Sequence, residues 1–345
     1  MNVAIVTNQT PFVRGGAELL AETLRDQLVL HGHESQVVRL PFAWSPPARI
    51  AEHMLASRLI RLGNTDHVIA LKFPAYYVEH ESKVVWLLHQ FRQAYDVYDA
   101  PGDGLADKPS GPAIEGMIQR ADGIFLRAAK AVFTNSEITR DRLKRFNDID
   151  STVLLPPLWD DAGYRCEDYG DYILALGRIS PAKRQNLLIE AMEHTTTDVR
   201  LVVAGAPEND ALGEWLAHLA ADSSARDRIT LIPRWISDEE KLDLLAGALA
   251  CAYVPFDEDS YGYVTLESFR CRKPVVTSTD AGGVLTIVED GETGYVVEPE
   301  PQALAAAFDR LREGSPPAAV LGGNAGARLD GLQLSWSHVI DTLLP

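Results

Sequence analysis

Cysteine is scarce in this chain of 345 residues. The three cysteines, Cys166, Cys251 and Cys271, are too few and too widely spaced for a disulfide framework or a zinc knuckle. No apolar run approaches the ~20 residues that a membrane-spanning helix requires. The first ten residues, MNVAIVTNQT, contain no basic segment followed by an apolar core, so we expect no signal peptide. These absences predict a soluble, cytoplasmic protein.

Basic residues are under-represented in the second half of the chain. The formal net charge is −17, and residues 1–160 contribute little of it, with 17 basic and 19 acidic residues. Residues 161–345 hold 15 basic and 30 acidic residues. Because nucleic-acid binding requires a basic face that neutralises phosphates, this composition excludes a general nucleic-acid binder. A small anionic ligand in one local basic pocket remains compatible with it.

The length and the hydrophobic pattern predict two α/β domains. Hydrophobic residues make up 46% of the chain and charged residues 23%, which is typical of a globular protein. Short apolar strands alternate with amphipathic helices, as in parallel sheets that are covered by helices on both faces. In the first half we expect strands at Val3–Thr7, Gln36–Leu40, His67–Leu71, Lys83–Leu88, Ala131–Asn135 and Thr152–Leu155. In the second half we expect them at Tyr172–Leu176, Arg200–Ala204, Arg228–Ile232, Ala250–Val254, Pro274–Thr277 and Tyr295–Val297.

Proline and glycine mark the boundaries of these domains. Residues 99–116 are rich in Gly, Pro and Asp and predict a long loop. Pro156-Pro157 begins a polar linker that extends to Asp171. We therefore expect two doubly wound domains joined near residue 160. Ligands of such sheets bind at the carboxyl ends of the strands, so we expect them in a cleft that the two domains face.

The densest functional signal is PFDEDSYGYVTLESFRCRKPVVTSTDAGG, residues 255–283. It places Gly262 before a short helix that begins near Tyr263, and helix N-termini bind anions through their free N–H groups. Glu267 lies about one turn further along, where a carboxylate can accept hydrogen bonds from paired hydroxyls. An exposed acidic helix is the alternative interpretation. Asp257-Glu258-Asp259 and Asp148-Ile149-Asp150 also fit a D-x-D metal motif, but divalent cations require more oxygen ligands, so we expect no metal site.

Three further segments carry weaker signals. Arg178 and Lys183 lie at a strand-to-helix turn, which suits a diphosphate; a solvated start of a helix is the alternative. Gly15-Gly16 follows the first strand and either allows a ligand close to the backbone or forms an ordinary turn. His89 lies at the end of a buried strand, either in an active site or as a structural histidine.

In these segments the chain resembles family-4 retaining glycosyltransferases of the GT-B fold, also described as glycosyl transferases group 1. The 255–283 segment resembles the E-x7-E motif of that family, and LGRISPAKRQNLLIEAM resembles its donor-diphosphate turn. GGAELLAETLRDQLVLHGHE, FTNSEITRDRL and LSWSHVIDTLL resemble its first loop and helix, its serine-containing strand end and its final helix. The motifs occur in the family's order over nearly the whole chain.

The resemblance implies a GT-B fold with two Rossmann-like domains. Residues 1–160 would form the acceptor-binding domain and residues 161–330 the donor domain. Residues 331–345 would form a C-terminal helix that packs back on the N-terminal domain. The implied substrate is a nucleoside-diphosphate sugar, with no further cofactor and no metal.

The resemblance also assigns roles to individual residues. His89, Arg178, Lys183 and Asp259 would be catalytic: the two cations hold the diphosphate, Asp259 contacts donor-sugar hydroxyls, and His89 lies beside the donor sugar. Glu267 would bind the ribose hydroxyls of the donor. The other donor-binding residues would be Gly15, Gly16, Arg234, Trp235, Gly262, Tyr263 and Val264.

The chain departs from the family pattern at two positions. The first acidic residue of the E-x7-E motif is Asp259, one methylene shorter than Glu, which affects sugar preference or activity. The family usually has Gly after Lys183, where this chain has Arg184. Arg184 either adds a cation to the donor site or, as we expect for a long charged side chain, points into solvent.

The resemblance predicts a retaining glycosyltransferase that moves a sugar to an acceptor hydroxyl on a glycan, a lipid-linked sugar or a small metabolite. The alternatives are another GT-B enzyme, such as a hydrolysing epimerase, and a non-catalytic nucleotide-sugar-binding module. The basic residues between Arg127 and Arg145 suggest a weak peripheral membrane contact or, alternatively, a solvated helix face. Nucleic acid is not an expected partner.

Overall fold

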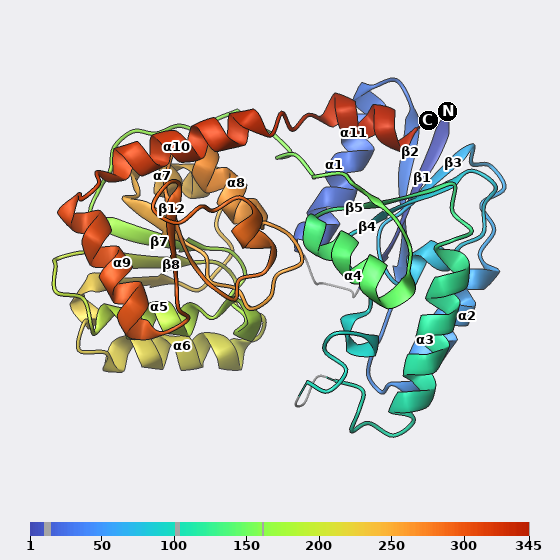
Figure 1. Ribbon diagram of the computed structural model, residues 1–345, viewed down its shortest axis with the longest axis horizontal. Coiled ribbons are helices and arrows are strands. Elements are labelled where there is room, and N and C mark those ends of the chain that lie inside the picture. Colours follow the sequence, from blue (N-terminus) through green and yellow to red (C-terminus); the bar gives the residue numbers. More distant parts are fainter. Residues whose placement is uncertain (10–14, 101–103, 161, 345) are drawn as a thin grey trace. The chain divides into compact units, whose positions relative to one another are not determined.

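The computed structural model describes residues 1–9, 15–100, 104–160 and 162–344. It divides into two compact units, one formed by Met1–Trp159 with Leu334–Pro345 and the other by Asp160–Gln333. Each unit is built on a parallel six-stranded sheet with helices packed against it (Figure 1). None of the helices in the described part of the chain is both long and apolar enough to cross a bilayer.

The N-terminal unit has the strand order β2-β1-β3-β4-β5-β6. Its central strands are buried on both faces, because helices cover the sheet from both sides. The strands are β1 (Asn2–Gln9), β2 (Glu34–Pro41), β3 (His67–Ala70), β4 (Lys83–Leu87), β5 (Ala131–Thr134) and β6 (Thr152–Val153). The helices are α1 (Gly16–Leu30), α2 (Ala48–Leu59), α3 (Gly111–Phe125), α4 (Glu137–Asn147) and the C-terminal α11 (Trp336–Leu343).

Helix α11 joins this unit although about 180 residues separate it from β6 in sequence. Its buried residues Val339, Ile340 and Leu343 pack in one cluster with residues of β1 and α1. Trp336 donates a hydrogen bond from Nε1 to the Leu158 carbonyl at 2.8 Å. Burial of three aliphatic side chains and this bond fix the C-terminal segment on the unit.

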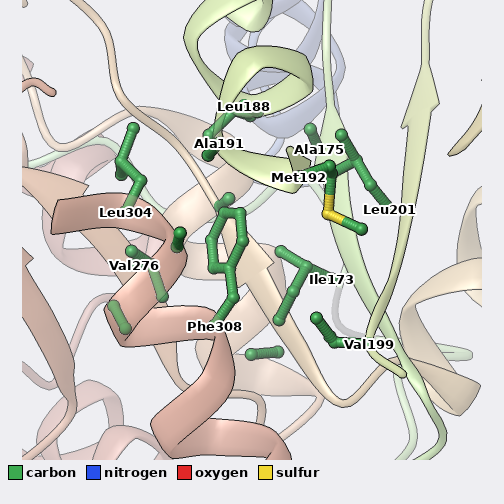
Figure 2. Packing of buried hydrophobic residues seen from close by; sticks show 14 of the residues in the cluster. Ile173, Ala175, Leu188, Ala191, Met192, Val199, Leu201, Val276, Leu304 and Phe308 are labelled. Carbon is green, nitrogen blue, oxygen red and sulfur yellow. The ribbon is translucent and has the colours of Figure 1, made fainter. Parts of the chain in front are cut away.

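The C-terminal unit has the strand order β12-β11-β10-β7-β8-β9. In its core, Phe308 of α9 packs among Ile173, Val276 and Met192 (Figure 2). The strands are β7 (Tyr172–Leu176), β8 (Arg200–Ala204), β9 (Ile229–Ile232), β10 (Ala250–Ala252), β11 (Val275–Ser278) and β12 (Gly294–Val297). The helices are α5 (Gln185–Met192), α6 (Asp210–Asp222), α7 (Asp238–Gly247), α8 (Tyr263–Arg270), α9 (Pro301–Glu313) and α10 (Ala318–Gly331).

The connectivity of the second sheet determines where it can bind a ligand. Strand β7 comes first in this unit, and it lies between β8 and β10. The chain leaves β7 toward β8 and β9 and then returns to β10 on the opposite side. The strand order therefore reverses between β7 and β10, and open α/β sheets bind ligands at the carboxyl ends of the strands at such a point.

Polar side chains define where several helices begin. Ser136, Asn209, Ser237 and Ser335 each accept a hydrogen bond from a backbone N–H in the first turn of α4, α6, α7 and α11, respectively. Such caps satisfy N–H groups that have no partner within the helix.

The prediction of a loop over residues 99–116 is wrong from residue 111 onward, where α3 begins. Pro112 lies in the first turn, where its missing N–H costs no helical hydrogen bond. The following residues Ile114 and Ile118 bury one face of the helix. Tertiary packing, rather than local composition, therefore sets this boundary.

Candidate functional site

Lys183 connects the segments that follow β7 and β10. It ends the short 3-10 helix Pro181–Lys183 after β7. Its Nζ donates a hydrogen bond to the Tyr253 hydroxyl at 2.6 Å and forms an ion pair with Glu258. Tyr253 also donates to Glu258, over 3.1 Å. The structure thus places an ammonium group, a carboxylate and a phenol together where the strand order reverses.

Gly262 brings the start of α8 to the same place. A Cβ atom at this position would lie 2.5 Å from Cε1 of Tyr253, so a larger residue cannot pack there. Its φ of 68° also lies in the region that glycine adopts without strain. At Gly177, directly after β7, a Cβ atom would be 3.6 Å from the Val264 side chain. The N-terminus of α8, with Tyr263 and Val264, therefore lies beside the end of β7.

The loop that precedes α8 is held by backbone hydrogen bonds. The Glu258 N–H donates to the Ala281 carbonyl at 3.2 Å, and the Gly283 N–H donates to the Glu258 carbonyl at 2.8 Å. Asp259 is partly exposed in this loop. The backbone of the loop is thus fixed independently of the Lys183–Glu258 ion pair.

Arg178 is the exposed cation of the site. It follows Gly177 at the carboxyl end of β7. Within the residues that the structure describes, its guanidinium forms no ion pair or hydrogen bond. A cation without an internal partner, beside the Lys183 cluster, can bind an anion without first breaking a protein contact.

Glu267 is buried in the middle of α8, with 3% of its surface exposed. Its Oε1 accepts a hydrogen bond from the Tyr164 hydroxyl at 3.0 Å and lies 3.0 Å from Nζ of Lys241. Burial raises the pKa of the Glu267 carboxyl, whereas the Lys241 ammonium and the Tyr164 hydroxyl oppose this increase. The Glu267 carboxylate is therefore buried and has two polar partners, which does not fit the alternative of an exposed acidic helix.

Arg234 and Trp235 follow β9, at the edge of the sheet and two strands away from β7. The Arg234 guanidinium donates to both carboxylate oxygens of Glu240, at 2.9 and 2.7 Å. Trp235 is 72% exposed. Glu240 and Lys241 are adjacent in α7, so this helix contacts both Arg234 and Glu267. Their role at a nucleotide base stays a prediction.

The remaining predicted residues belong to the N-terminal unit. Gly15 and Gly16 are exposed at the start of α1, after β1. His89 is partly buried two residues after β4, and its Nδ1 lies 2.7 Å from the Gln90 carbonyl. All three lie at carboxyl ends of strands in their own sheet, and their contact with a donor stays a prediction.

The expectation that Arg184 points into solvent is wrong. Its guanidinium forms a double ion pair with Asp280, at 2.7 and 2.8 Å. It also donates to the carbonyls of Val254 and Pro255 and to the Ser278 hydroxyl. The Arg184 backbone has a φ of +51°, a conformation that favours glycine. The five hydrogen bonds of the side chain offset the strain that an arginine incurs at this position.

We expect Arg184→Ala to destabilise the C-terminal unit by about 2–4 kcal/mol, because buried acceptors lose their donor and the strain remains. Arg184→Gly removes the same bonds but relieves the strain, so it should cost about 1 kcal/mol less. The Arg184 guanidinium lowers the pKa of Asp280 below its ordinary value. This contribution to stability is present above the ordinary pKa and disappears as the pH falls through the lowered one.

Urea denaturation at pH 7 and at pH 3 measures both effects. The difference between wild type and Arg184→Ala should shrink on acidification. Equal stability of the alanine variant and the wild type at pH 7 would contradict the structural role of Arg184.

Most basic side chains between Arg127 and Arg145 have partners within their own unit. Arg127 donates to the carbonyls of Gly123 and Asn147. Arg142 pairs with Asp96, and Lys144 pairs with Asp148 and Asp150. These contacts within the unit account for the basic residues without a membrane surface. The peripheral membrane contact stays a prediction.

Residues 166–328 match the family model described as Glycosyl transferases group 1. The C-terminal unit thus matches the family of glycosyl transferases group 1. The matched segment contains Arg178, Lys183, Asp259 and Glu267, and it ends five residues before this unit does.

Solved structures show that the whole chain has the GT-B fold. WaaG, a glycosyltransferase involved in lipopolysaccharide biosynthesis, superimposes with a TM-score of 0.78 at 16% identity, over 99% of both chains. HepE (Alr3699) from Anabaena, in complex with UDP and glucose, gives a TM-score of 0.72 at 17% identity, also over 99% of both chains. The fold predicted from the sequence, two Rossmann-like α/β domains of the GT-B class, is confirmed.

Curated relatives resemble a shorter part of the chain. A D-inositol 3-phosphate glycosyltransferase of Stackebrandtia nassauensis is 32% identical over 178 residues, which is 49% of this chain and 39% of that protein. The chain therefore spans about two fifths of the length of the first curated relatives that it matches.

Four residues of the site escaped the sequence analysis: Tyr164, Lys241, Tyr253 and Glu258. Glu258 stands beside Asp259 in an acidic triplet, and Tyr253 lies in the predicted strand Ala250–Val254, so both belong to segments that the sequence analysis considered. Tyr164 and Lys241 contact Glu267 across 103 and 26 residues of sequence. Local patterns carry no signal for such contacts.

Proposed function

We propose that this chain is a retaining glycosyltransferase that moves a sugar from a nucleoside-diphosphate sugar to an acceptor hydroxyl, without a metal. The observation that carries the proposal is the convergence of Arg178, Lys183 and the N-terminus of α8 where the strand order reverses. Arginine, lysine and helix N–H groups are the groups that bind a diphosphate. The HepE structures, with UDP and with UDP-glucose, support a nucleotide sugar as the donor.

The chemistry of these groups suits the departure of a diphosphate. As the bond between the anomeric carbon and the phosphate oxygen breaks, negative charge develops on the leaving oxygens. Arg178, Lys183 and the N–H groups at the start of α8 would stabilise this charge and lower the barrier. Asp259 would orient the sugar through its hydroxyls, and Glu267 would hold the ribose. In this proposal the acceptor hydroxyl attacks the anomeric carbon from the side of the departing phosphate, and the phosphate accepts the proton of the hydroxyl. Attack from this side retains the anomeric configuration.

A binding panel with UDP, GDP, dTDP and ADP, each with and without EDTA, tests the donor site. We expect one diphosphate to raise the melting temperature and to bind in calorimetry, with the same affinity in EDTA. The corresponding nucleotide sugars are then assayed for transfer, and NMR of the product gives its anomeric configuration. Absence of binding by all four, in folded protein, would contradict the proposed donor site; binding without transfer or hydrolysis of any nucleotide sugar would favour a non-catalytic module.

Glu258 gives a prediction specific to this chain. A bound diphosphate would compete with the Glu258 carboxylate for Lys183, and the two anions would repel each other. Glu258→Gln should therefore increase affinity for the diphosphate by about three- to tenfold, roughly 0.6–1.4 kcal/mol. Calorimetry measures this, with Glu292→Gln as the control on an exposed glutamate. Weaker binding by Glu258→Gln would instead show that Glu258 supports the ligand.

A further inference from the structure

The two contacts of Glu267 end on the same carboxylate oxygen. Tyr164 donates to Oε1 from the segment before β7, and Lys241 donates to Oε1 from α7. No group in residues 1–9, 15–100, 104–160 or 162–344 donates to Oε2. A side chain that is almost completely buried thus has one oxygen with two donors and another with none among these residues.

We propose that Lys241 and Tyr164 are positioning residues of the nucleotide site, which hold Glu267 through Oε1 so that Oε2 accepts the paired ribose hydroxyls. This inference rests on the proposed function and adds two residues to it. A hydroxyl pair binds most strongly to a carboxylate that is ionised and fixed in orientation. Lys241 supplies the charge that keeps Glu267 ionised, and Tyr164 fixes the direction of its carboxylate.

The surroundings of Glu267 make Lys241 the important cation. Asp238, on the same helix as Lys241, raises the pKa of Glu267, as burial does. Burial also raises the pKa of Cys251 to about 12 and that of Cys271 to about 11, and it raises the pKa of Tyr263. These three neighbours are therefore neutral at pH 7. The Lys241 ammonium, in contrast, favours the ionised form of Glu267 through its charge.

The segment that contains Tyr164 is packed on α7, so its position is defined. A Cβ atom at Gly163 would lie 2.8 Å from Cδ1 of Leu242, and Arg165 pairs with Asp243 at 2.7 Å. Tyr164 and Lys241 therefore approach Glu267 from one fixed unit formed by α7 and this segment. A structural ion pair between α7 and α8 would show the same distances, so the test must report on ionisation and on ligand affinity.

The first experiment is a titration of Glu267 without ligand. Protein labelled with 13C-glutamate is followed by carboxyl-carbon NMR from pH 4 to pH 8, and Glu267→Gln assigns the signal. Lys241→Met should raise the pKa of Glu267 by about one or more, and Lys241→Arg should restore it. Lys144→Met, which breaks a surface pair in the other unit, should leave it unchanged. A pKa that does not respond to Lys241→Met overturns the role of Lys241.

The second experiment uses whichever of UDP, GDP, dTDP and ADP binds wild type most tightly. Lys241→Met should weaken its affinity about tenfold or more at pH 7, and the loss should decrease toward pH 8 as Glu267 ionises. Lys241→Arg should recover most of the affinity, and Tyr164→Phe should lose about three- to tenfold. Unchanged affinity in Lys241→Met and Tyr164→Phe overturns the inference while the proposed function stands. If none of the four binds wild type, the proposed function fails, and the titration still decides whether Lys241 controls the charge of Glu267.

Discussion

Glu267→Gln should weaken binding of the donor nucleotide by about 10- to 150-fold, roughly 1.5–3 kcal/mol, because a hydrogen bond to a charged acceptor is lost inside the protein. Glutamine is the better substitution than alanine. It keeps an oxygen acceptor for Tyr164 and Lys241, whereas Glu267→Ala would remove the oxygen to which both of these groups donate. Calorimetric titration at pH 7, with melting temperatures measured in parallel, separates the binding effect from the folding effect.

A matched control is available in the same unit. Glu313 is exposed at the end of α9, so Glu313→Gln should change neither affinity nor stability. Nucleosides provide a second comparison: if Glu267 contacts ribose, Glu267→Gln should weaken binding of the nucleoside as well as that of its diphosphate. Wild-type affinity in Glu267→Gln would remove this residue from the binding site.

The architecture could be predicted because parallel sheets leave a strong local signal. Their strands are buried on both faces and read as short runs of Val, Ile, Leu and Ala, as in β1 and β7. Each run is separated from the next by an amphipathic helix, so the α/β class follows from the sequence alone. The start of α3 was missed because Gly111 and Pro112 look like loop residues, although Ile114 and Ile118 are buried.

Arg184 shows where local reasoning about the site fails. The departure from the family's glycine is visible in the sequence, but its consequence depends on a positive φ and on acceptors 70 to 96 residues away. Neither can be inferred from the neighbouring residues. The general preference of arginine for solvent therefore gave the wrong prediction.

The side chains that contact the motif residues of the site could not be predicted either, because they lie far away in the sequence. Arg178, Lys183 and Glu267 stand in motifs with characteristic spacing, and spacing reflects the local backbone geometry. Glu258 reaches Lys183 across 75 residues, and Tyr164 reaches Glu267 across 103. Such pairs form because β10 and β7 become neighbours in the sheet, and only the folded topology shows this.

Arg178→Ala should reduce the rate of sugar transfer by about 100- to 1,000-fold, the effect of removing one preorganised charge from a developing anion. Its affinity for the diphosphate should fall by about tenfold or more, and its affinity for the nucleoside should not change. Stability should stay within about 0.5 kcal/mol of wild type, because the exposed guanidinium forms no hydrogen bond or ion pair with the described residues. Transfer kinetics, calorimetry and thermal melting together measure these three effects.

Arg200 provides the matched control for Arg178. It is also an exposed arginine of the C-terminal unit, but it begins β8 and therefore lies at the amino end of the sheet. Both alanine variants lose one positive charge from the same acidic unit, so a general effect of charge on anion binding should appear in both. A loss in Arg178→Ala alone locates the diphosphate at the carboxyl end of β7. Equal losses would show that net charge, rather than a defined diphosphate site, attracts the nucleotide. The effect of Glu267→Gln on the affinity for the nucleoside would then decide whether Glu267 still forms a ribose site.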